Sequence, residues 1–116
     1  MEDIRVKTAA YTLDGHTYTI RCNMNVLADV QEAYGGNLTK ALNTASGLKG
    51  ILAFLAAMLN DAADTEKRPE RFTARELGRT LTINQTLEAG KLIMPLIRTA
   101  VVGDEPAEEA AEDEKN

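Results

Sequence analysis

The sequence predicts an α+β fold in which an N-terminal β-hairpin packs on a mainly α-helical body of four or five helices. Asp14-Gly15 stands between two runs of alternating residues, which is the pattern of a hairpin with a two-residue turn. A long apolar stretch with helical spacing occupies the middle of the chain, at residues 46–63. Several other segments begin with helix-capping residues. We expect residues 1–102 to form one domain and residues 103–116 to form a disordered acidic tail.

Charge is distributed unevenly along the 116 residues, whose formal net charge is -5. Seven of the 18 acidic residues, but one of the 13 basic residues, lie from Gly103 onward. The body is therefore nearly neutral and has no cationic footprint, so we expect no binding to nucleic acid. The tail is rich in alanine and lacks large apolar residues, which predicts disorder because burial cannot offset the entropy of ordering.

Cys22 is the single cysteine, which excludes an internal disulfide and a cysteine-based metal knot and suits a reducing cytosol. The first six residues are charged where a signal peptide would be apolar, so we expect no secretion. The central apolar stretch falls just short of a bilayer span of about 20 residues, and its flanks are those of a globular protein. We therefore expect no membrane segment.

The predicted hairpin has one apolar side. Its two-residue turn fixes a register that pairs Leu13 with His16, Tyr11 with Tyr18 and Ala9 with Ile20. The threonines then lie on the other side. Ile4 and Val6 have the opposite parity, so a strand beginning that early would need a bulge near residues 8–10. Since an isolated hairpin is marginal in water, its apolar side should lie on the central helix.

Two helices are predicted between the hairpin and the central stretch. Asn23 can cap a helix of about three turns, and Gly35-Gly36 provides a left-handed end. Asn37 can cap a further turn or two before the pattern ends at residues 43–46. The buried stripe of the first helix is expected at Leu27, Val30, Tyr34 and, with a weaker pattern, Met24.

The central helix is the expected core of the domain, with Ser46 as its N-cap. Alanines and Phe54 extend its apolar surface most of the way round, so it should be buried on several sides. Its principal stripe comprises Leu48, Ile51, Leu52, Leu55, Met58, Leu59 and Ala62.

After a charged loop that contains Pro69, two capping boxes predict the last two helices. Thr73 with Glu76 opens a short helix to about Leu81, and Thr82 with Gln85 opens the last one. Pro95 should kink or break the last helix and allow its C-terminal half to move independently. The predicted buried stripe of that helix comprises Ile83, Leu87, Met94, Ile97 and Val101, widened by Ile93 and Leu96.

The sequence contains no phosphate-binding glycine loop, catalytic carboxylate pair or nucleophile elbow. His16 and Cys22 fall at opposite ends of one predicted strand, which argues against a metal site or a nucleophile pair. We therefore expect a protein-binding domain that is not an enzyme and needs no cofactor. A basic edge at Arg71, Arg75 and Arg79 is either a solvated face or a docking edge for an acidic partner or the chain's own tail.

The order of three short motifs resembles the small tail-assembly chaperones of long-tailed bacteriophages, prophages and gene-transfer agents. These motifs are a hairpin, a polar-x-Asn-x-Leu helix start and a Glu-x-aromatic-Gly helix end, and the resemblance covers roughly residues 8–102. Gln31 and Glu32 replace a more common acidic pair. The matching positions are Leu13, Gly15, Thr17, Tyr18, Ile20, Asn25, Leu27, Glu32, Tyr34 and Gly35.

This resemblance implies a chaperone in the cytoplasm of the bacterial host that binds the tape-measure protein and helps recruit tail-tube subunits. It would be absent from the finished virion. Two alternatives are a virion structural subunit of the tail tube or connector and a small acidic protein-binding regulator. The sequence leaves the oligomeric state open, a homo-oligomer included.

An apolar, helical client requires adaptable side chains in its groove, and residues around the expected Pro95 kink can provide them. The alternative is that the same residues fill the core. The expected partner-binding residues are Tyr34, Met58, Met94, Leu96, Ile97, Arg71, Arg75 and Arg79.

Overall fold

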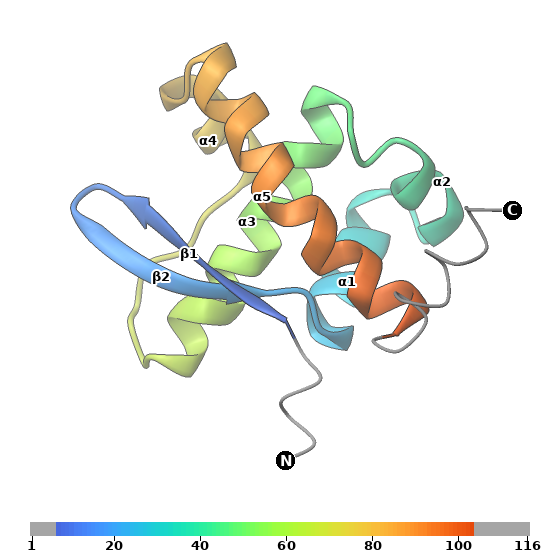
Figure 1. Ribbon diagram of the computed structural model, residues 1–116, viewed down its shortest axis with the longest axis horizontal. Helices are drawn as coiled ribbons and strands as arrows, with labels where there is room; N and C mark the ends of the chain where they lie inside the picture. Colours follow the sequence, from blue (N-terminus) through green and yellow to red (C-terminus); the bar gives the residue numbers. More distant parts are fainter. Residues whose placement is uncertain (1–6, 104–116) are drawn as a thin grey trace, which may run out of the picture.

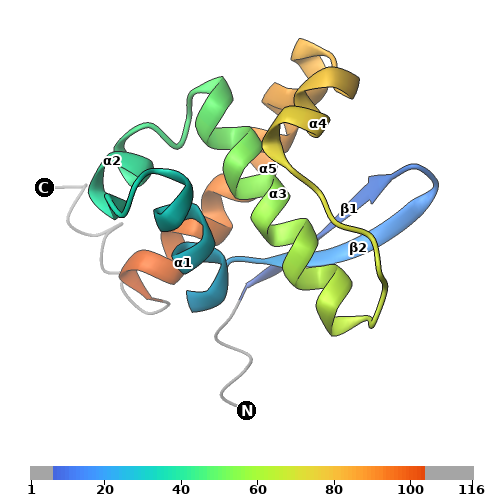
Figure 2. The ribbon, with the colours of Figure 1, turned by 180° about the vertical axis from the view of Figure 1, so that it is seen from behind.

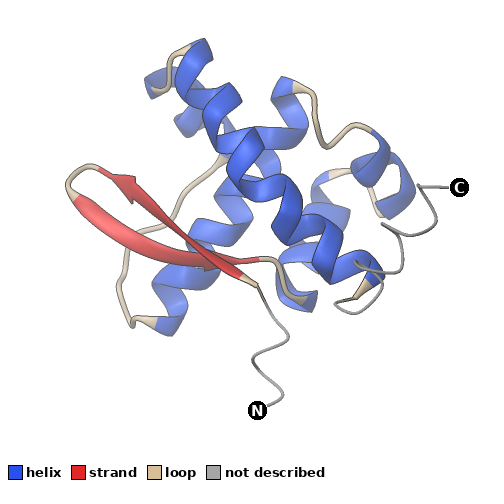
Figure 3. Ribbon diagram, viewed as in Figure 1, coloured by secondary structure: helices blue, strands red, loops and turns tan. Residues whose placement is uncertain are grey.

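A two-stranded antiparallel hairpin precedes five helices in the computed structural model, which describes residues 7–103 (Figures 1 and 3). This arrangement confirms the predicted class and the helical body. The predicted acidic tail lies, from residue 104, outside the described residues, as do Ile4 and Val6. The elements are β1 (Thr8–Leu13), β2 (His16–Arg21), α1 (Met24–Ala33), α2 (Leu38–Asn43), α3 (Leu48–Thr65), α4 (Ala74–Thr80) and α5 (Ile83–Val102).

The hairpin turn has the predicted geometry, with positive φ angles of 51° at Asp14 and 81° at Gly15. The strand register is also the predicted one, from Leu13 paired with His16 to Thr8 paired with Arg21. β2 lies on α3 and buries the side chains of Tyr18 and Ile20. The apolar side of the hairpin thus faces the central helix, as expected.

Asparagine caps start the next two helices. The Asn23 side chain accepts a hydrogen bond from the Val26 amide at 3.0 Å, and the Asn37 side chain accepts one from the Lys40 amide at 3.0 Å. Each bond satisfies an amide that has no partner within its helix. Gly35, at φ 66°, and the glycine after it end α1 as predicted.

The core is organised around α3, ten of whose eighteen residues are buried. The hairpin, α1, α4 and α5 all contact this helix, and α5 crosses over it (Figures 1 and 2). The central prediction from the sequence is therefore confirmed. Among residues 7–103, no helix combines the length and the apolar character needed to cross a membrane.

The start of α3 differs from the prediction. Gly47 is the N-cap in place of Ser46, and it makes no side-chain capping bond. The α2–α3 turn packs so closely on the helix that a β-carbon at Gly50 would lie 2.7 Å from the α-carbon of Ala45. With Gly50 facing the turn, Leu48 projects to the opposite side and is 48% exposed, where the sequence predicted burial.

Both predicted N-caps form, but only the second is a complete capping box among the described residues. The Thr73 hydroxyl accepts a hydrogen bond from the Glu76 amide at 3.1 Å at the start of α4. At the start of α5 the capping box is complete, since Thr82 and Gln85 bond in both directions at 2.8 and 3.1 Å.

The rotation of α5 about its own axis differs from the prediction, although Ile93, Leu96 and Ile97 of the predicted stripe are buried. Its buried face contains small residues, and a β-carbon at Gly90 would lie 2.7 Å from Cδ1 of Ile51 on α3. This close approach turns the small residues toward α3 and leaves much of the predicted stripe outside. The buried residues of α5 are Thr86, Ala89, Gly90, Ile93, Leu96 and Ile97, whereas Ile83, Leu87, Met94 and Val101 are exposed.

The predicted break at Pro95 does not occur, because α5 continues without interruption from Ile83 to Val102. Proline in a helix removes the hydrogen bond to the carbonyl four residues earlier, here that of Lys91. Both residues are exposed, so water can satisfy that carbonyl. The C-terminal half of α5 therefore remains part of one helix.

Candidate functional site

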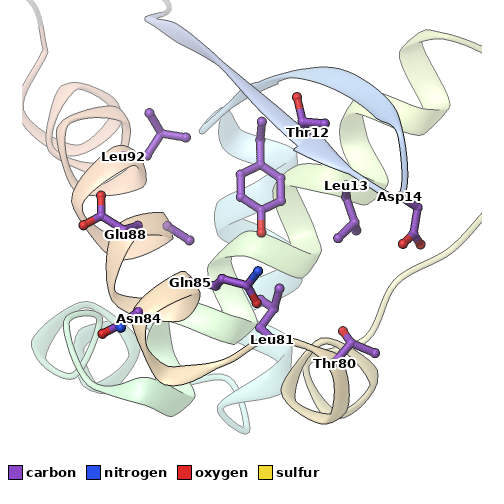
Figure 4. Close-up of a pocket in the computed structure, with 11 residues that line it drawn as sticks. Thr12, Leu13, Asp14, Thr80, Leu81, Asn84, Gln85, Glu88 and Leu92 are labelled. Carbon is purple, nitrogen blue, oxygen red and sulfur yellow. The ribbon is translucent and has the colours of Figure 1, made fainter.

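A cleft of about 650 Å³ lies between the hairpin and α5 (Figure 4). We call it the β1–α5 cleft. Tyr11 and Leu13 line it from β1, and Ala89 and Leu92 line it from α5. Its volume falls within the range of sites that bind small molecules or short peptide segments.

The cleft exists because the hairpin is only half covered by helices. Tyr11 and Leu13 share the apolar side of the ribbon with Tyr18 and Ile20, which are buried under α3. β2 lies on α3, whereas β1 lies beside α5, and the two large side chains of β1 are only half-buried. Burial raises the pKa of Tyr11 above its ordinary value, because a phenolate would be poorly solvated in this position.

The charged groups that line the cleft are acidic. Asp14 at the hairpin turn and Glu88 on α5 lie on opposite sides of it (Figure 4). Glu88 has one exposed basic neighbour, Lys91, at 3.6 Å, and such an exposed pair offsets little of its charge. The cleft therefore favours a cationic occupant over an anionic one.

A second, smaller hollow of about 300 Å³ lies beside the loop between α3 and α4. Here Glu70 accepts hydrogen bonds from the Tyr18 hydroxyl at 2.7 Å and from Arg68 Nε at 2.6 Å. The bond from Arg68, with that from Tyr18, lowers the pKa of Glu70 to about 2. The Tyr18 ring also makes edge contacts with the rings of His16 and Phe72. These contacts compensate the charges within the cluster and attach the loop to the hairpin.

The predicted groove of adaptable side chains does not form. Met58 is fully buried, and Leu96 and Ile97 are also in the core, so the prediction that they contact a partner is wrong. The alternative interpretation, that such residues fill the core, holds for these three. Met94 is exposed. Tyr34 is half-buried, with Lys49 Nζ 5.4 Å from the centre of its ring.

The basic edge is exposed along its length, but its members differ. Arg71 pairs with Asp64 at 2.5 Å, which compensates part of its charge. Arg75 and Arg79 project from α4 and form no ion pair with residues 7–103. Arg68, which the sequence places nearby, instead joins Glu70 and the Tyr18 ring.

α5 carries an exposed row of apolar residues that the sequence predicted to be buried. Its members are spaced by four and seven residues, which places them within about 40° of one another around the helix. The row and the cleft lie on different sides of α5, with the core between them. We call this exposed row the α5 row, and its members are Ile83 (59% exposed), Leu87 (44%), Met94 (36%) and Val101 (49%).

Comparisons with protein-family models, with curated proteins and with solved structures found no match to this chain.

Proposed function

We propose that this chain is a chaperone that binds apolar helical segments of another protein. The observation that carries the proposal is the α5 row, which presents four large apolar side chains to solvent from one uninterrupted helix. Amphipathic helices bind other proteins through anchors at such helical spacings. From Ile83 to Val101 the row spans 19 residues, or about 27 Å of helix, which a client helix of about five turns would cover.

Charge beside the row gives the client a preferred composition. Lys91 and Arg98 are exposed on α5 and border the α5 row. A client helix with acidic residues beside its apolar stripe would complement them. Such pairs contribute little affinity at a protein surface, but they select among clients and orient them.

The sequence resemblance gives this role a specific form, that of a phage tail-assembly chaperone in the host cytoplasm. Its client would be the tape-measure protein, and tail-tube subunits would be its second partner. Several residues of the resembling motifs have structural roles in the described chain, which supports this proposal. Gly15 and Gly35 adopt positive φ angles, and Tyr18 and Leu27 are buried.

Co-expression with the tape-measure protein encoded nearby tests this proposal. We expect the wild-type chain to co-purify with that protein and to keep it soluble. The double variant Leu87→Gln/Met94→Gln should lose most of this effect, because it removes apolar area at the centre of the α5 row without disturbing the core. Met24→Gln is the matched control, since Met24 is 64% exposed on α1.

Two results would argue against the proposal. One is a wild-type chain that neither co-purifies with the tape-measure protein nor improves its solubility. The other is a double variant that protects the client as well as Met24→Gln does, which would show that the α5 row is not the binding surface.

A further inference from the structure

Strand β1 has one edge without a hydrogen-bonding partner among residues 7–103. Leu13 pairs with His16 across a two-residue turn, so these two residues exchange both backbone hydrogen bonds. Bonded pairs then alternate along the ribbon. The N–H and C=O groups of Thr8, Ala10 and Thr12 therefore point away from β2.

The free edge and the β1–α5 cleft lie together. Thr12 lines the cleft, as do Tyr11 and Leu13 on the apolar side of the same strand. Across the cleft, Ala89 and Leu92 of α5 supply an apolar wall. An added strand would thus find backbone partners along one edge and an apolar surface for every second side chain.

From this arrangement we propose that the cleft binds an extended peptide segment of another protein, which adds to the free edge of β1 as a third strand. The segment has apolar side chains at alternate positions and carries lysine or arginine. Asp14 and Glu88 select the basic side chains. β1 has six residues, which fits a bound segment of about the same length, or about 20 Å.

Charge also argues against two other occupants. The C-terminal tail, with seven acidic residues and one lysine, has the same sign as Asp14 and Glu88. A second copy paired through its own β1 would bring the same two carboxylates into one cleft.

This site lies on a different side of α5 from the α5 row, so the inference does not rest on the proposed chaperone role. Each can fail alone. Leu87→Gln/Met94→Gln should leave peptide binding unchanged, and the cleft variants below should leave retention of a helical client unchanged.

The test uses the full chain and a capped peptide, Lys-Val-Thr-Val-Thr-Lys, with a glutamate-ended peptide as its matched control. Titration calorimetry should show binding of the lysine peptide and at least about fivefold weaker binding of the glutamate peptide. The double variant Asp14→Asn/Glu88→Gln should bind the lysine peptide about fivefold more weakly at low salt. Asparagine retains the turn, so only charge is lost. Asp29→Asn/Glu32→Gln on α1 makes the same charge change away from the cleft and should have no effect.

Backbone pairing is tested separately with Ala10→Pro. The Ala10 amide points outward, so proline removes a donor to the peptide without removing a bond to β2. Affinity should fall about tenfold, whereas Ala10→Val should retain it. In the wild-type complex, hydrogen exchange should slow at the amides of Ala10 and Thr12.

Three results would overturn the proposal. One is a lysine peptide that binds no better than the glutamate peptide. Another is binding of the lysine peptide that leaves hydrogen exchange at Ala10 and Thr12 unchanged. The third is a wild-type dimer that Ala10→Pro converts to a monomer, which would assign the edge to a second copy. If Ala10→Pro does not fold, the exchange measurement and the charge variants still decide the question.

Discussion

Asn60 of α3 forms two hydrogen bonds with the backbone of Phe72, which joins the loop between α3 and α4 to the central helix. The Asn60 side chain donates to the Phe72 carbonyl at 2.9 Å and accepts from the Phe72 amide at 2.7 Å. The side-chain amide thus replaces the backbone partner that the loop lacks at this point. Arg68 and Glu70 attach the same loop to the hairpin through Tyr18.

Asn60→Ala should therefore destabilise the protein by about 2 kcal/mol, because it leaves both backbone groups of Phe72 without their partner. Urea denaturation measures this change as a lower midpoint at constant slope. Asn25→Ala is the control, since Asn25 is exposed on α1. Equal midpoints for the two variants would show that the loop does not depend on Asn60.

Two glycines in helices should respond oppositely to alanine. A β-carbon at Gly50 would lie 2.7 Å from the α-carbon of Ala45, a backbone atom that cannot move aside cheaply. At Gly78 the nearest atom is the end of the Leu52 side chain, at 3.3 Å. Gly50→Ala should destabilise by about 2 kcal/mol despite its better helix propensity, whereas Gly78→Ala should be neutral or stabilise by up to about 1 kcal/mol.

Thermal denaturation of both variants measures the contrast. A Gly50→Ala protein as stable as the wild type would mean that the α2–α3 turn is not packed against the start of α3. That result would also remove the reason given for the exposure of Leu48.

Most boundaries of the elements could be predicted because their signals are local. Asp14-Gly15 fixes the hairpin, and each asparagine or threonine cap bonds to the amide three residues later. The start of α3 is the exception, since tertiary contact at Gly50 overrides the cap expected from Ser46. Capping signals therefore predict where a helix begins only where no closer packing competes.

Contacts between distant residues could not be predicted in the same way. α5 carries apolar residues on more than one side, and the fit of Gly90 against Ile51 decides which side is buried. The β1–α5 cleft depends on that rotation and on the placement of β1 beside α5. The attachment of Glu70 to Tyr18, 52 residues earlier, also gives no periodic signal in the sequence.

The hydrogen bonds of Glu70 predict an acid-sensitive stability. Arg68 and Tyr18 hold the pKa of Glu70 at about 2 in the folded protein, against 4.5 for an unperturbed carboxyl group. The depressed pKa stabilises the fold above about pH 4.5, and this contribution is lost as the pH falls toward 2. The melting temperature of Glu70→Gln should therefore be below that of the wild type at neutral pH and should converge with it toward pH 2.

Glu32→Gln is the control for this series, because Glu32 is exposed on α1. Its melting temperature should follow that of the wild type at every pH. A constant difference between Glu70→Gln and the wild type down to pH 2 would contradict the assigned role of the carboxylate.

The Cys22 thiol should be inert in the folded protein. It is buried, and burial raises the pKa of the thiol to about 12. Almost no reactive thiolate therefore exists at about pH 8. Iodoacetamide should label the protein rapidly in guanidinium and very slowly without denaturant. Rapid labelling of native protein would show that the region after β2 opens readily.

Pro95 lies within α5 and leaves the carbonyl of Lys91 without a helical partner, although the helix continues past it. Alanine would restore this hydrogen bond and remove the clash of the ring, so Pro95→Ala should stabilise the protein by about 1–3 kcal/mol. Chemical denaturation measures the gain. Thr99→Ala, four residues later on α5, is a control that changes no main-chain bond. An unchanged stability for Pro95→Ala would mean that the last two turns are not helical in solution, and Val101 would then not align with the rest of the α5 row.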